Sequence, residues 1–260
     1  MPALPRARKR FGQHFLTDRH YVDRIVRAIA PAHGDAMVEI GPGTGILTRE
    51  LSAHLAHLHV VEIDRDLASA LRREFPDDRI SVHQADALEF DFASLPSALR
   101  VVGNLPYNVS TPILFRMAAL ADRLRDCVFM LQKEVVERMV AAPATPEYGR
   151  LSVMLQYRFA MALVLRVPPG AFTPPPKVDS AVVRMEPLAL GRLRAKDEAL
   201  FARLVAASFE QRRKMLRSAL RPLVEPGAFE AAGIDASRRG ETLSVAEFVA
   251  LSDAAATRAG

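Results

Sequence analysis

The chain has 260 residues, half of them hydrophobic, which is enough for one large domain and a smaller appended one. Charged residues make up 25% of the chain, and neither glycine nor proline is in excess, so the composition excludes extended disorder and fibrous repeats. The formal net charge is +5, and basic residues gather in the first ten residues and at 212–221. This clustering indicates a polyanionic partner such as nucleic acid, with a solvated helix face as the alternative.

The start of the chain indicates where the protein works, and the surroundings of its single cysteine indicate a structural role for that residue. No long apolar segment follows the basic first ten residues or occurs later, so we expect a cytoplasmic protein, neither secreted nor inserted in a membrane. A short organellar transit peptide is the alternative for the basic start. The single cysteine, Cys127, lies in an apolar run, where a buried small side chain is expected rather than a nucleophile or metal ligand.

Short apolar runs alternate with helical patterns between residues 36 and 185, which is typical of an α/β fold with a mostly parallel sheet. The expected strands are Ala36–Ile40, Leu58–Ile63, Ile80–Gln84, Val101–Asn104, Cys127–Leu131 and Ser180–Met185. The expected helices between them are Gly45–His57, Arg65–Phe75 and Thr111–Leu120. Ligands of such sheets bind at the carboxyl ends of the strands, so the loops after the first four strands should hold the functional residues.

The pattern changes after Pro187. The prolines between residues 168 and 176 exclude helix and central strand, so that stretch should be a rigid connection before the last strand. Beyond residue 187 the pattern predicts only helices, at Glu198–Phe209, Arg212–Leu220, Gly227–Ala232 and Val245–Ser252. We therefore expect one domain over residues 1–187 and a small all-helical domain over residues 188–260.

The first three loops carry residue types that suit an adenine nucleoside. Gly41 and Gly43 follow the first strand and let a ligand approach the backbone, although a structural tight turn would have the same pattern. Glu62 ends the second strand roughly 20 residues later, where a carboxylate can accept both ribose hydroxyls. Asp86 follows the third strand, where it can accept a hydrogen bond from an adenine amino group or cap a helix. These loops do not by themselves separate NAD from S-adenosylmethionine.

The fourth loop, Asn104-Leu105-Pro106-Tyr107, favours S-adenosylmethionine. Adenine N6 is a poor nucleophile because its lone pair is delocalised into the ring. The Asn104 side-chain oxygen and the Leu105 carbonyl can accept both N6 hydrogens and favour a pyramidal nitrogen. Pro106 would fix the direction of that carbonyl, and Tyr107 would stack on a base taken out of its nucleic-acid surroundings. Such chemistry needs no metal; a plain β-turn is the alternative for this tetrapeptide.

With these motifs in order, the sequence resembles the ribosomal RNA adenine dimethyltransferase family, in its small-subunit branch. The segments that carry the resemblance are Arg8–Leu16, Glu39–Gly45, Gly103–Asn108, Leu131–Val135 and Phe172–Val178. The resemblance covers nearly the whole chain. It implies a Rossmann-like class I methyltransferase sheet with helices on both faces, a catalytic domain at residues 1–187 and a helical RNA-binding domain at 188–260.

The resemblance also implies site residues. The cofactor-binding residues it implies are His14, Leu16, Gly41, Gly43, Glu62, Asp86 and Asn104, where His14 stands at a position that many members fill with Asn. Phe172 would join Tyr107 in holding the target adenine. The expected RNA-binding residues are Arg212, Arg213, Lys214, Arg217 and Arg221.

The implied activity is transfer of methyl groups from S-adenosylmethionine to N6 of two adjacent adenines near the 3′ end of small-subunit (16S) ribosomal RNA. The implied substrate is an assembling 30S-type particle, and the enzyme is expected to be a monomer. The alternatives are a large-subunit RNA or DNA adenine methyltransferase, or a non-catalytic assembly factor on the same fold. A dehydrogenase is less favoured because the GxGxxG spacing is absent.

Overall fold

The computed structural model describes residues 14–189 and 193–258. The basic arm of the first ten residues, and the motif up to Gln13, lie outside the described residues. The chain forms two compact units, one of residues up to 136 with 160–187, and one of residues 137–159 with 188 onwards. The linear division expected at Pro187 did not anticipate that residues 137–159 join the second unit.

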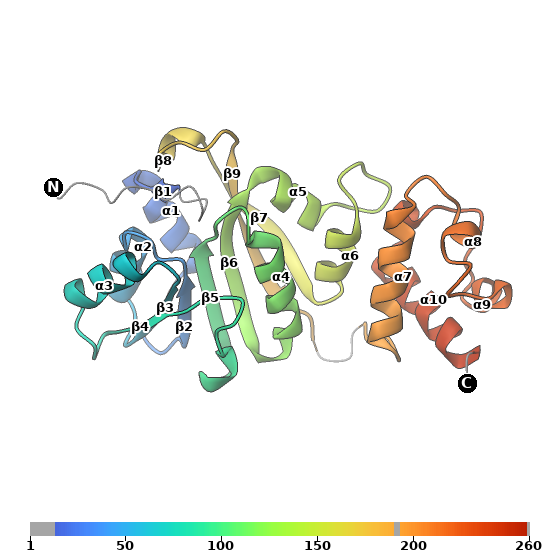
Figure 1. The fold of residues 1–260 in the computed structure, drawn as a ribbon, viewed down its shortest axis with the longest axis horizontal. Coiled ribbons are helices and arrows are strands. Elements are labelled where there is room, and N and C mark those ends of the chain that lie inside the picture. Colours follow the sequence, from blue (N-terminus) through green and yellow to red (C-terminus); the bar gives the residue numbers. More distant parts are fainter. Residues whose placement is uncertain (1–13, 190–192, 259–260) are drawn as a thin grey trace. The chain divides into compact units, whose positions relative to one another are not determined.

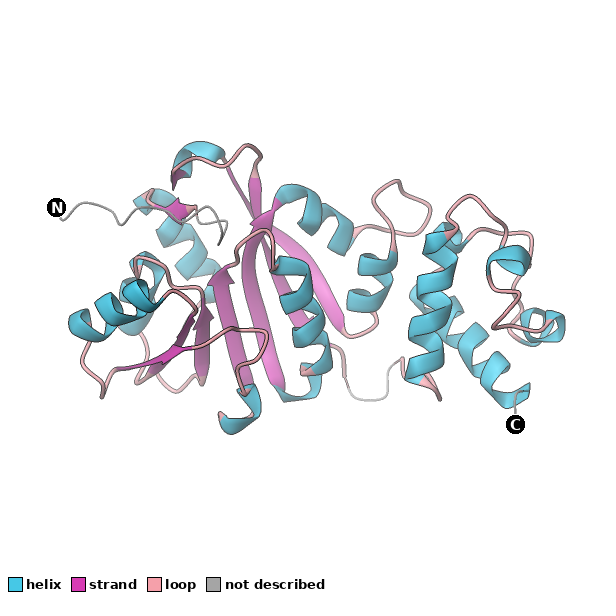
Figure 2. Ribbon diagram, in the orientation of Figure 1, coloured by secondary structure: helices cyan, strands magenta, loops and turns pink. Residues whose placement is uncertain are grey.

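The first unit contains a seven-stranded sheet with the order β4-β3-β2-β5-β6-β9-β7 (Figures 1 and 2). Its strands are β2 (Met37–Ile40), β3 (Leu58–Glu62), β4 (Ile80–Gln84), β5 (Leu99–Asn104), β6 (Leu124–Gln132), β7 (Phe159–Val167) and β9 (Ser180–Pro187). The neighbours from β4 to β6 pair in parallel, and β9 pairs antiparallel with β6. Each of the six expected strands is present, whereas the sequence analysis did not predict β7.

Helices flank the sheet (Figure 2). They are α1 (Arg19–Ile29), α2 (Ile46–Ser52), α3 (Arg65–Glu74), α4 (Ser110–Ala119) and α5 (Lys133–Val140), whose last four residues belong to the second unit. Helix α1, which was not predicted, begins at an Asp18 side chain that accepts the backbone N–H of His20, and its apolar positions are buried against the core. The expected helix Gly45–His57 was too long, because the chain leaves the helix after Ser52 and turns toward β3.

The core explains the continuous apolar runs of the strands. Both faces of a parallel sheet are covered, so β2, β5 and β6 bury nearly every side chain. Cys127 on β6 is buried as expected, and that burial raises the pKa of its thiol well above the ordinary value. A short second sheet pairs β1 (Phe15–Leu16) antiparallel with β8 (Phe172–Thr173).

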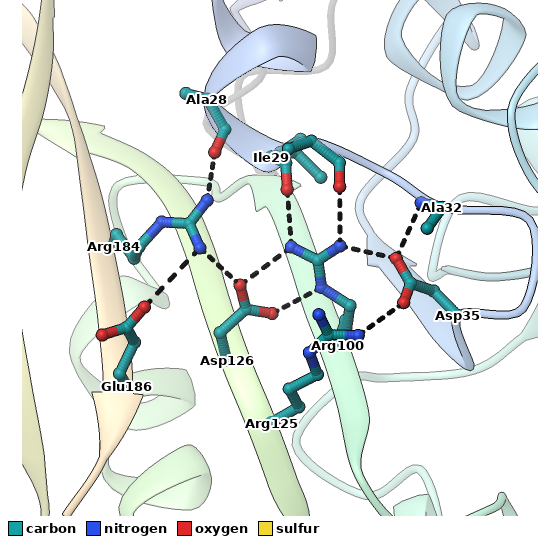
Figure 3. A network of polar contacts seen from close by, with 10 residues as sticks. Ala28, Ile29, Ala32, Asp35, Arg100, Arg125, Asp126, Arg184 and Glu186 are labelled. Carbon is teal, nitrogen blue, oxygen red and sulfur yellow. Dashed lines mark hydrogen bonds and ion pairs between the residues drawn. The ribbon is translucent and has the colours of Figure 1, made fainter.

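A buried ion-pair network crosses the amino ends of the strands (Figure 3). The Arg100 guanidinium donates to both oxygens of Asp126, at 2.7 and 2.9 Å, and to Asp35 at 2.6 Å. It also donates to the Ile29 carbonyl at 2.5 Å, and Arg184 contacts Asp126 from β9. The network thus ties the carboxyl end of α1 to strands β5, β6 and β9, which fixes the helix along the sheet.

The second unit is helical. Its helices are α6 (Arg150–Gln156), α7 (Glu198–Glu210), α8 (Leu216–Ala219), α9 (Pro226–Ala231) and α10 (Val245–Arg258). Tyr148 explains why residues 137–159 belong here, since its buried hydroxyl donates to the Leu243 carbonyl at 2.9 Å. Likewise, the Tyr157 ring packs on Phe201 at 4.3 Å.

One predicted helix of this unit was largely wrong. The helix expected over Arg212–Leu220 is confined to Leu216–Ala219, and residues 211–214 form turns before it. The Arg212 guanidinium instead donates hydrogen bonds to Glu241 at 2.6 Å and to the Pro146 carbonyl at 2.8 Å. In the ranges that the structure describes, no helix has both the length and the apolar content needed to span a bilayer.

Candidate active site

A cavity in the first unit opens at the carboxyl ends of the parallel strands. The loops after β2, β3, β4 and β5 line it, together with the segment that contains β1. The expected site residues that line this cavity are His14, Leu16, Gly41, Gly43, Glu62, Asp86, Asn104, Leu105, Pro106 and Tyr107. The expectation that functional residues gather at this edge of the sheet is therefore consistent with the structure.

Glycines shape the floor of the cavity. Gly41 and Gly43 have φ values of 67° and 58°, a conformation that residues with a Cβ rarely adopt. A Cβ on Gly43 would also lie 3.2 Å from the Phe15 ring, and a Cβ on Gly103 would lie 2.3 Å from the Ile40 carbonyl oxygen. The turn after β2 can therefore pack against Phe15, and the end of β5 against β2, only because these side chains are absent.

Glu62 is the carboxylate at the end of β3, and only 4% of it is exposed. One of its oxygens accepts the Gly43 N–H at 3.1 Å and the other accepts the Asp64 N–H at 2.8 Å. Burial raises the pKa of Glu62, and these backbone hydrogen bonds offset part of that rise. Asp64 caps α3 by accepting the Asp66 N–H at 2.9 Å. This arrangement favours Glu62 over Asp64 as the acceptor for ribose hydroxyls.

Asp86 both caps a turn and lines the cavity. One oxygen accepts the Leu88 N–H at 2.8 Å and so caps the turn that follows β4. The same residue lines the cavity on the wall beside Ala85 and Ala87. A carboxylate has room for further hydrogen bonds, so capping leaves it able to accept one from an amino group in the cavity.

The Asn104 amide has a defined orientation. Its Nδ2 donates to the main-chain carbonyl of His14 at 3.0 Å. A carbonyl oxygen can only accept, so the amide nitrogen must face His14, and the Oδ1 atom is the acceptor that the side chain presents elsewhere. Leu105 is buried, and its N–H donates to the Met130 carbonyl at 3.1 Å, which anchors the loop to β6. The loop is therefore pre-organised rather than loose.

Tyr107 is held at two points. Its hydroxyl lies 2.6 Å from the Oγ atom of Ser180, which is fully buried at the start of β9. Its ring lies 5.6 Å from the His14 ring, with an interplanar angle of 29°. Burial raises the pKa of the Tyr107 hydroxyl, and the hydrogen bond with Ser180 offsets part of that effect. The ring is thus a neutral flat surface in a fixed place.

Two residues of the cavity wall were missed by the sequence analysis. Glu39 on β2 is 1% exposed and accepts the Thr48 hydroxyl at 2.7 Å; burial, partly offset by this bond, raises the pKa of Glu39 to about 7. Ile63 follows Glu62, lines the cavity, and is 47% exposed, which is unusual for a large apolar side chain. The sequence held a signal for each of them: Glu39 is an acid inside an apolar strand, and Ile63 is an apolar residue between two acids.

Phe172 and the basic residues do not line the cavity. Phe172 is 3% exposed, packs in the core, and pairs with Leu16 in the β1–β8 ladder, so its ring is not presented to a base in this structure. The basic residues lie in the second unit and are exposed, namely Arg212, Arg213, Lys214, Arg217 and Arg221. Among the residues that the structure describes, no group of three or more His, Cys, Asp or Glu side chains could hold a metal ion.

Solved structures confirm the expected class I methyltransferase fold. The chain is similar to a dimethyladenosine transferase from Plasmodium falciparum, with a TM-score of 0.79 and 24% identity over 92% of this chain and 96% of that one. It is also similar to the 23S rRNA methyltransferase ErmE, with a TM-score of 0.72 and 26% identity over 92% of this chain and 98% of that one.

Curated relatives are more similar in sequence. The ribosomal RNA small subunit methyltransferase A of Aromatoleum aromaticum is 58% identical over 248 residues, which cover 95% of this chain and 94% of the relative. The protein of the same name from Thiobacillus denitrificans is 58% identical over 251 residues, or 96% of this chain and 98% of the relative. The sequence model described as ribosomal RNA adenine dimethylase matches residues 5–257. Because this match spans almost the entire sequence, the chain belongs to the ribosomal RNA adenine dimethylase family.

Proposed function

We propose that this enzyme transfers methyl groups from S-adenosylmethionine to N6 of two adjacent adenines near the 3′ end of small-subunit ribosomal RNA. The observation that carries the proposal is the Asn104 amide, whose nitrogen is engaged by His14 and whose oxygen is left to accept from an amino group. Family membership and relatives named small-subunit methyltransferases support the choice of RNA. We further propose that it acts in the cytoplasm, as a monomer, on an assembling 30S-type particle.

The cavity residues fit S-adenosylmethionine. Glu62 suits the ribose hydroxyls, because a lone pair remains on each oxygen after its backbone hydrogen bond. Asp86 suits the adenine amino group, and exposed Ile63 offers an apolar surface to the base. The Gly41 and Gly43 backbone allows close approach of the methionine part. When bound, the cofactor supplies a methyl group activated by its positive sulfonium.

The chain's own residues prepare the target adenine. The Asn104 oxygen and the Leu105 carbonyl each accept one N6 hydrogen, which draws the nitrogen lone pair out of conjugation and toward the methyl donor. Pro106 restricts the backbone beside that carbonyl. Tyr107 provides the stacking surface that retains the extruded base. After transfer the methylated nitrogen is acidic and releases its proton to water, so no strong base is required.

Exposed basic residues of the second unit are proposed as an RNA-contacting surface. Arg213, Lys214, Arg217 and Arg221 are exposed side chains that can reach phosphates. Arg212 is also exposed, but its guanidinium is engaged by Glu241, so its contribution should be smaller. The separation of cofactor cavity and basic residues into different units predicts that RNA binding and cofactor binding can be altered independently.

The test is transfer of labelled methyl groups to small-subunit particles from cells that lack the enzyme, followed by mass mapping of the adenines. Large-subunit particles and duplex DNA serve as controls for the alternative substrates. Two dimethylated adenines near the 3′ end of the small-subunit RNA are expected. Preferential labelling of large subunits or DNA would overturn the proposal, and absence of transfer to any substrate would favour a non-catalytic assembly factor.

A further inference from the structure

We propose that His59 and His83 are positioning residues that hold strand β4 and the Asp86 turn against β3, and that this hold is lost when both imidazoles are protonated. The inference rests on the proposed function, because Glu62 and Asp86 are the acceptors assigned there to the nucleoside of S-adenosylmethionine. Three observations carry it: the hydrogen bond between the two rings, their place on the outermost strand, and the contact of one ring with the turn that carries Asp86.

His59 and His83 are joined by a hydrogen bond between their rings. The Nδ1 atom of His59 lies 3.1 Å from the Nε2 atom of His83, and the ring centroids are 5.4 Å apart at an angle of 29°. Such a bond needs a proton on one nitrogen and a lone pair on the other. It therefore persists when one imidazole is charged. It is lost when both are charged, because two N–H groups and two positive charges then face each other.

This bond lies at the edge of the sheet. Strand β4 is the outermost strand of the seven-stranded sheet and pairs in parallel with β3. The register sets His83 opposite Val61, two residues beyond His59, so the two imidazoles are diagonal neighbours on one face. An outer strand has a neighbour on one side only, so a weaker contact with β3 is not compensated on the other side. The next pair along these strands is Glu62 with Gln84.

His83 also contacts the turn that carries Asp86. Its ring lies 4.9 Å from the Phe90 ring. The Phe90 N–H donates to the Asp86 carbonyl at 2.8 Å and closes the turn, while the Ala85 N–H donates to the Glu62 carbonyl at 3.1 Å. Displacement of His83 should therefore move Asp86 relative to Glu62. The acceptors for adenine and for ribose would then no longer match one nucleoside.

The charged or titratable groups that act on this pair in the described structure are His57 and Arg72, and both are basic. The His57 ring lies 4.9 Å from that of His59, and its nitrogens are engaged by the Asp78 carbonyl and the Ser81 hydroxyl. Arg72 reaches from α3 to the main-chain carbonyl before His83. These neighbours add to the repulsion that a second proton on the pair would meet.

The sign of the pH dependence follows from the same contacts. Burial, together with His57 and His83, lowers the pKa of His59 from 6.5 to about 4. Burial, together with Arg72 and His57, lowers the pKa of His83. The unfolded or opened chain binds these protons more readily than the folded one. The stabilising contribution of the pair is therefore complete above about pH 6.5 and is lost as the pH falls toward 4.

A pair of amides removes the titration and keeps the hydrogen bond. The amide of Asn reaches about as far as Nδ1 of histidine, and that of Gln about as far as Nε2. The double variant His59→Asn with His83→Gln therefore places a non-titrating donor and acceptor where the two ring nitrogens meet. The matched control is His33→Asn with His54→Gln, which removes two exposed histidines of the same unit. Thermal unfolding at pH 7.5 shows that each protein is folded.

Two quantities are compared between pH 7.5 and pH 5. Amide hydrogen exchange of β4 in the cofactor-free chain, corrected for the intrinsic rate at each pH, measures opening of the strand. Calorimetry measures the affinity for S-adenosylmethionine. In the wild type and the control variant, both quantities should fall by about tenfold more than in the amide variant. Glu62 and the other acids titrate in all three proteins, so the difference isolates the two histidines.

The coupling must also act in the opposite direction. If protonation of the pair weakens cofactor binding, saturating S-adenosylmethionine must disfavour that protonation to the same extent. NMR titration of the imidazole signals should therefore show a lower pKa for His59 and His83 in the complex than in the free chain. His33 and His54 should titrate alike in both.

The proposal is wrong if the amide variant loses β4 protection and cofactor affinity as steeply with acid as the wild type does. It is also wrong if acid opens β4 in the wild type while cofactor affinity follows that of the amide variant, because the histidines would then hold the strand without positioning Asp86. Failure of the proposed function has a different signature. S-adenosylmethionine would then not bind even at pH 7.5, where both imidazoles are neutral.

Discussion

At the scale of single residues, Asn104 is the side chain whose two ends have different tasks. Its nitrogen is bound to the His14 carbonyl, so its oxygen is oriented before any substrate arrives. An acceptor fixed in advance costs no reorganisation during the reaction, and its effect should appear in the transition state rather than in binding. Two substitutions at this position separate the acceptor from the orientation.

Asn104→Ala removes the acceptor and should lower the single-turnover rate at saturating RNA and cofactor by about two or more orders of magnitude. RNA affinity should stay near that of the wild type. Asn104→Asp keeps an acceptor oxygen but places the other oxygen against the His14 carbonyl, so it should also be severely slowed. Rapid-quench methyl transfer checks both. Near-normal turnover by either variant would remove the assigned role from Asn104.

Glu39 makes stability depend on pH through one buried carboxyl. Burial raises the pKa of Glu39 from 4.5 to about 7, so the folded chain holds a proton that the unfolded chain releases. The contribution of this bound proton to the stability of the folded chain is therefore complete below about pH 4.5 and is lost as the pH rises through about 7. Glu39→Gln stays neutral and can still accept the Thr48 hydroxyl.

As the pH rises from about 5 to about 8, the free energy of unfolding of Glu39→Gln should increase by about 2 kcal/mol relative to that of the wild type. Urea unfolding of both cofactor-free proteins across this range measures the difference. A difference that does not change with pH would mean that Glu39 titrates near its ordinary value.

At the scale of elements, the close approach of β5 to β2 is what brings the fourth loop next to the glycine turn. Gly103 makes this approach feasible, because a Cβ there would lie 2.3 Å from the Ile40 carbonyl oxygen. The neighbour is backbone, which cannot move aside as a flexible side chain can. The parallel pairing of Glu39 with Val102 immediately precedes this point, so the strain would fall on the sheet beside the site.

Gly103→Ala should therefore destabilise the fold by about 3 kcal/mol or more and weaken cofactor binding in what remains folded. Gly34→Ala is the matched control, since a Cβ at Gly34 would meet no atom within 4 Å, and its stability should change by less than about 1 kcal/mol. Chemical denaturation of the two variants checks the contrast. Equal stability of the two would show that β2 and β5 can separate without cost.

At the scale of the whole molecule, we expect the two units to divide catalysis and RNA binding. Replacing Arg213, Lys214 and Arg217 by Ala should weaken RNA binding and reduce the slope of log K against log salt by about 0.7–0.9 for each lost phosphate contact. Cofactor affinity should not change. Filter binding over a range of salt concentrations measures the slope.

A matched variant of the first unit tests whether position matters or only charge. Arg24→Ala with Arg27→Ala removes two exposed positive charges from α1. If this variant reduces the slope of log K against log salt by as much, for each charge removed, as the variant of the second unit does, net charge alone explains the effect. A smaller effect would support a defined RNA-contacting surface on the second unit.

The sequence by itself determined the parallel sheet and the order of its functional loops. Buried strands appear as continuous apolar runs, and such runs are local, so the strands from β2 to β6 and β9 could be predicted within a few residues. The placement of Gly41, Glu62 and Asp86 on one cavity follows from the same pattern, since parallel strands end at one edge. The sequence analysis did not predict helix α1 or strand β7.

Only the tertiary structure decided what holds these loops in place. The contact of Asn104 with His14 joins residues 90 positions apart, and no local pattern carries such a pairing. Phe172, which the family resemblance had implied as a partner of the target base, lies in the β1–β8 ladder and is buried. The turn at residues 211–214 and the joining of residues 137–159 to the second unit were likewise settled by packing. Periodicity fixes which face of an element is apolar, whereas partners that are distant in sequence are chosen by the free energy of the assembled core.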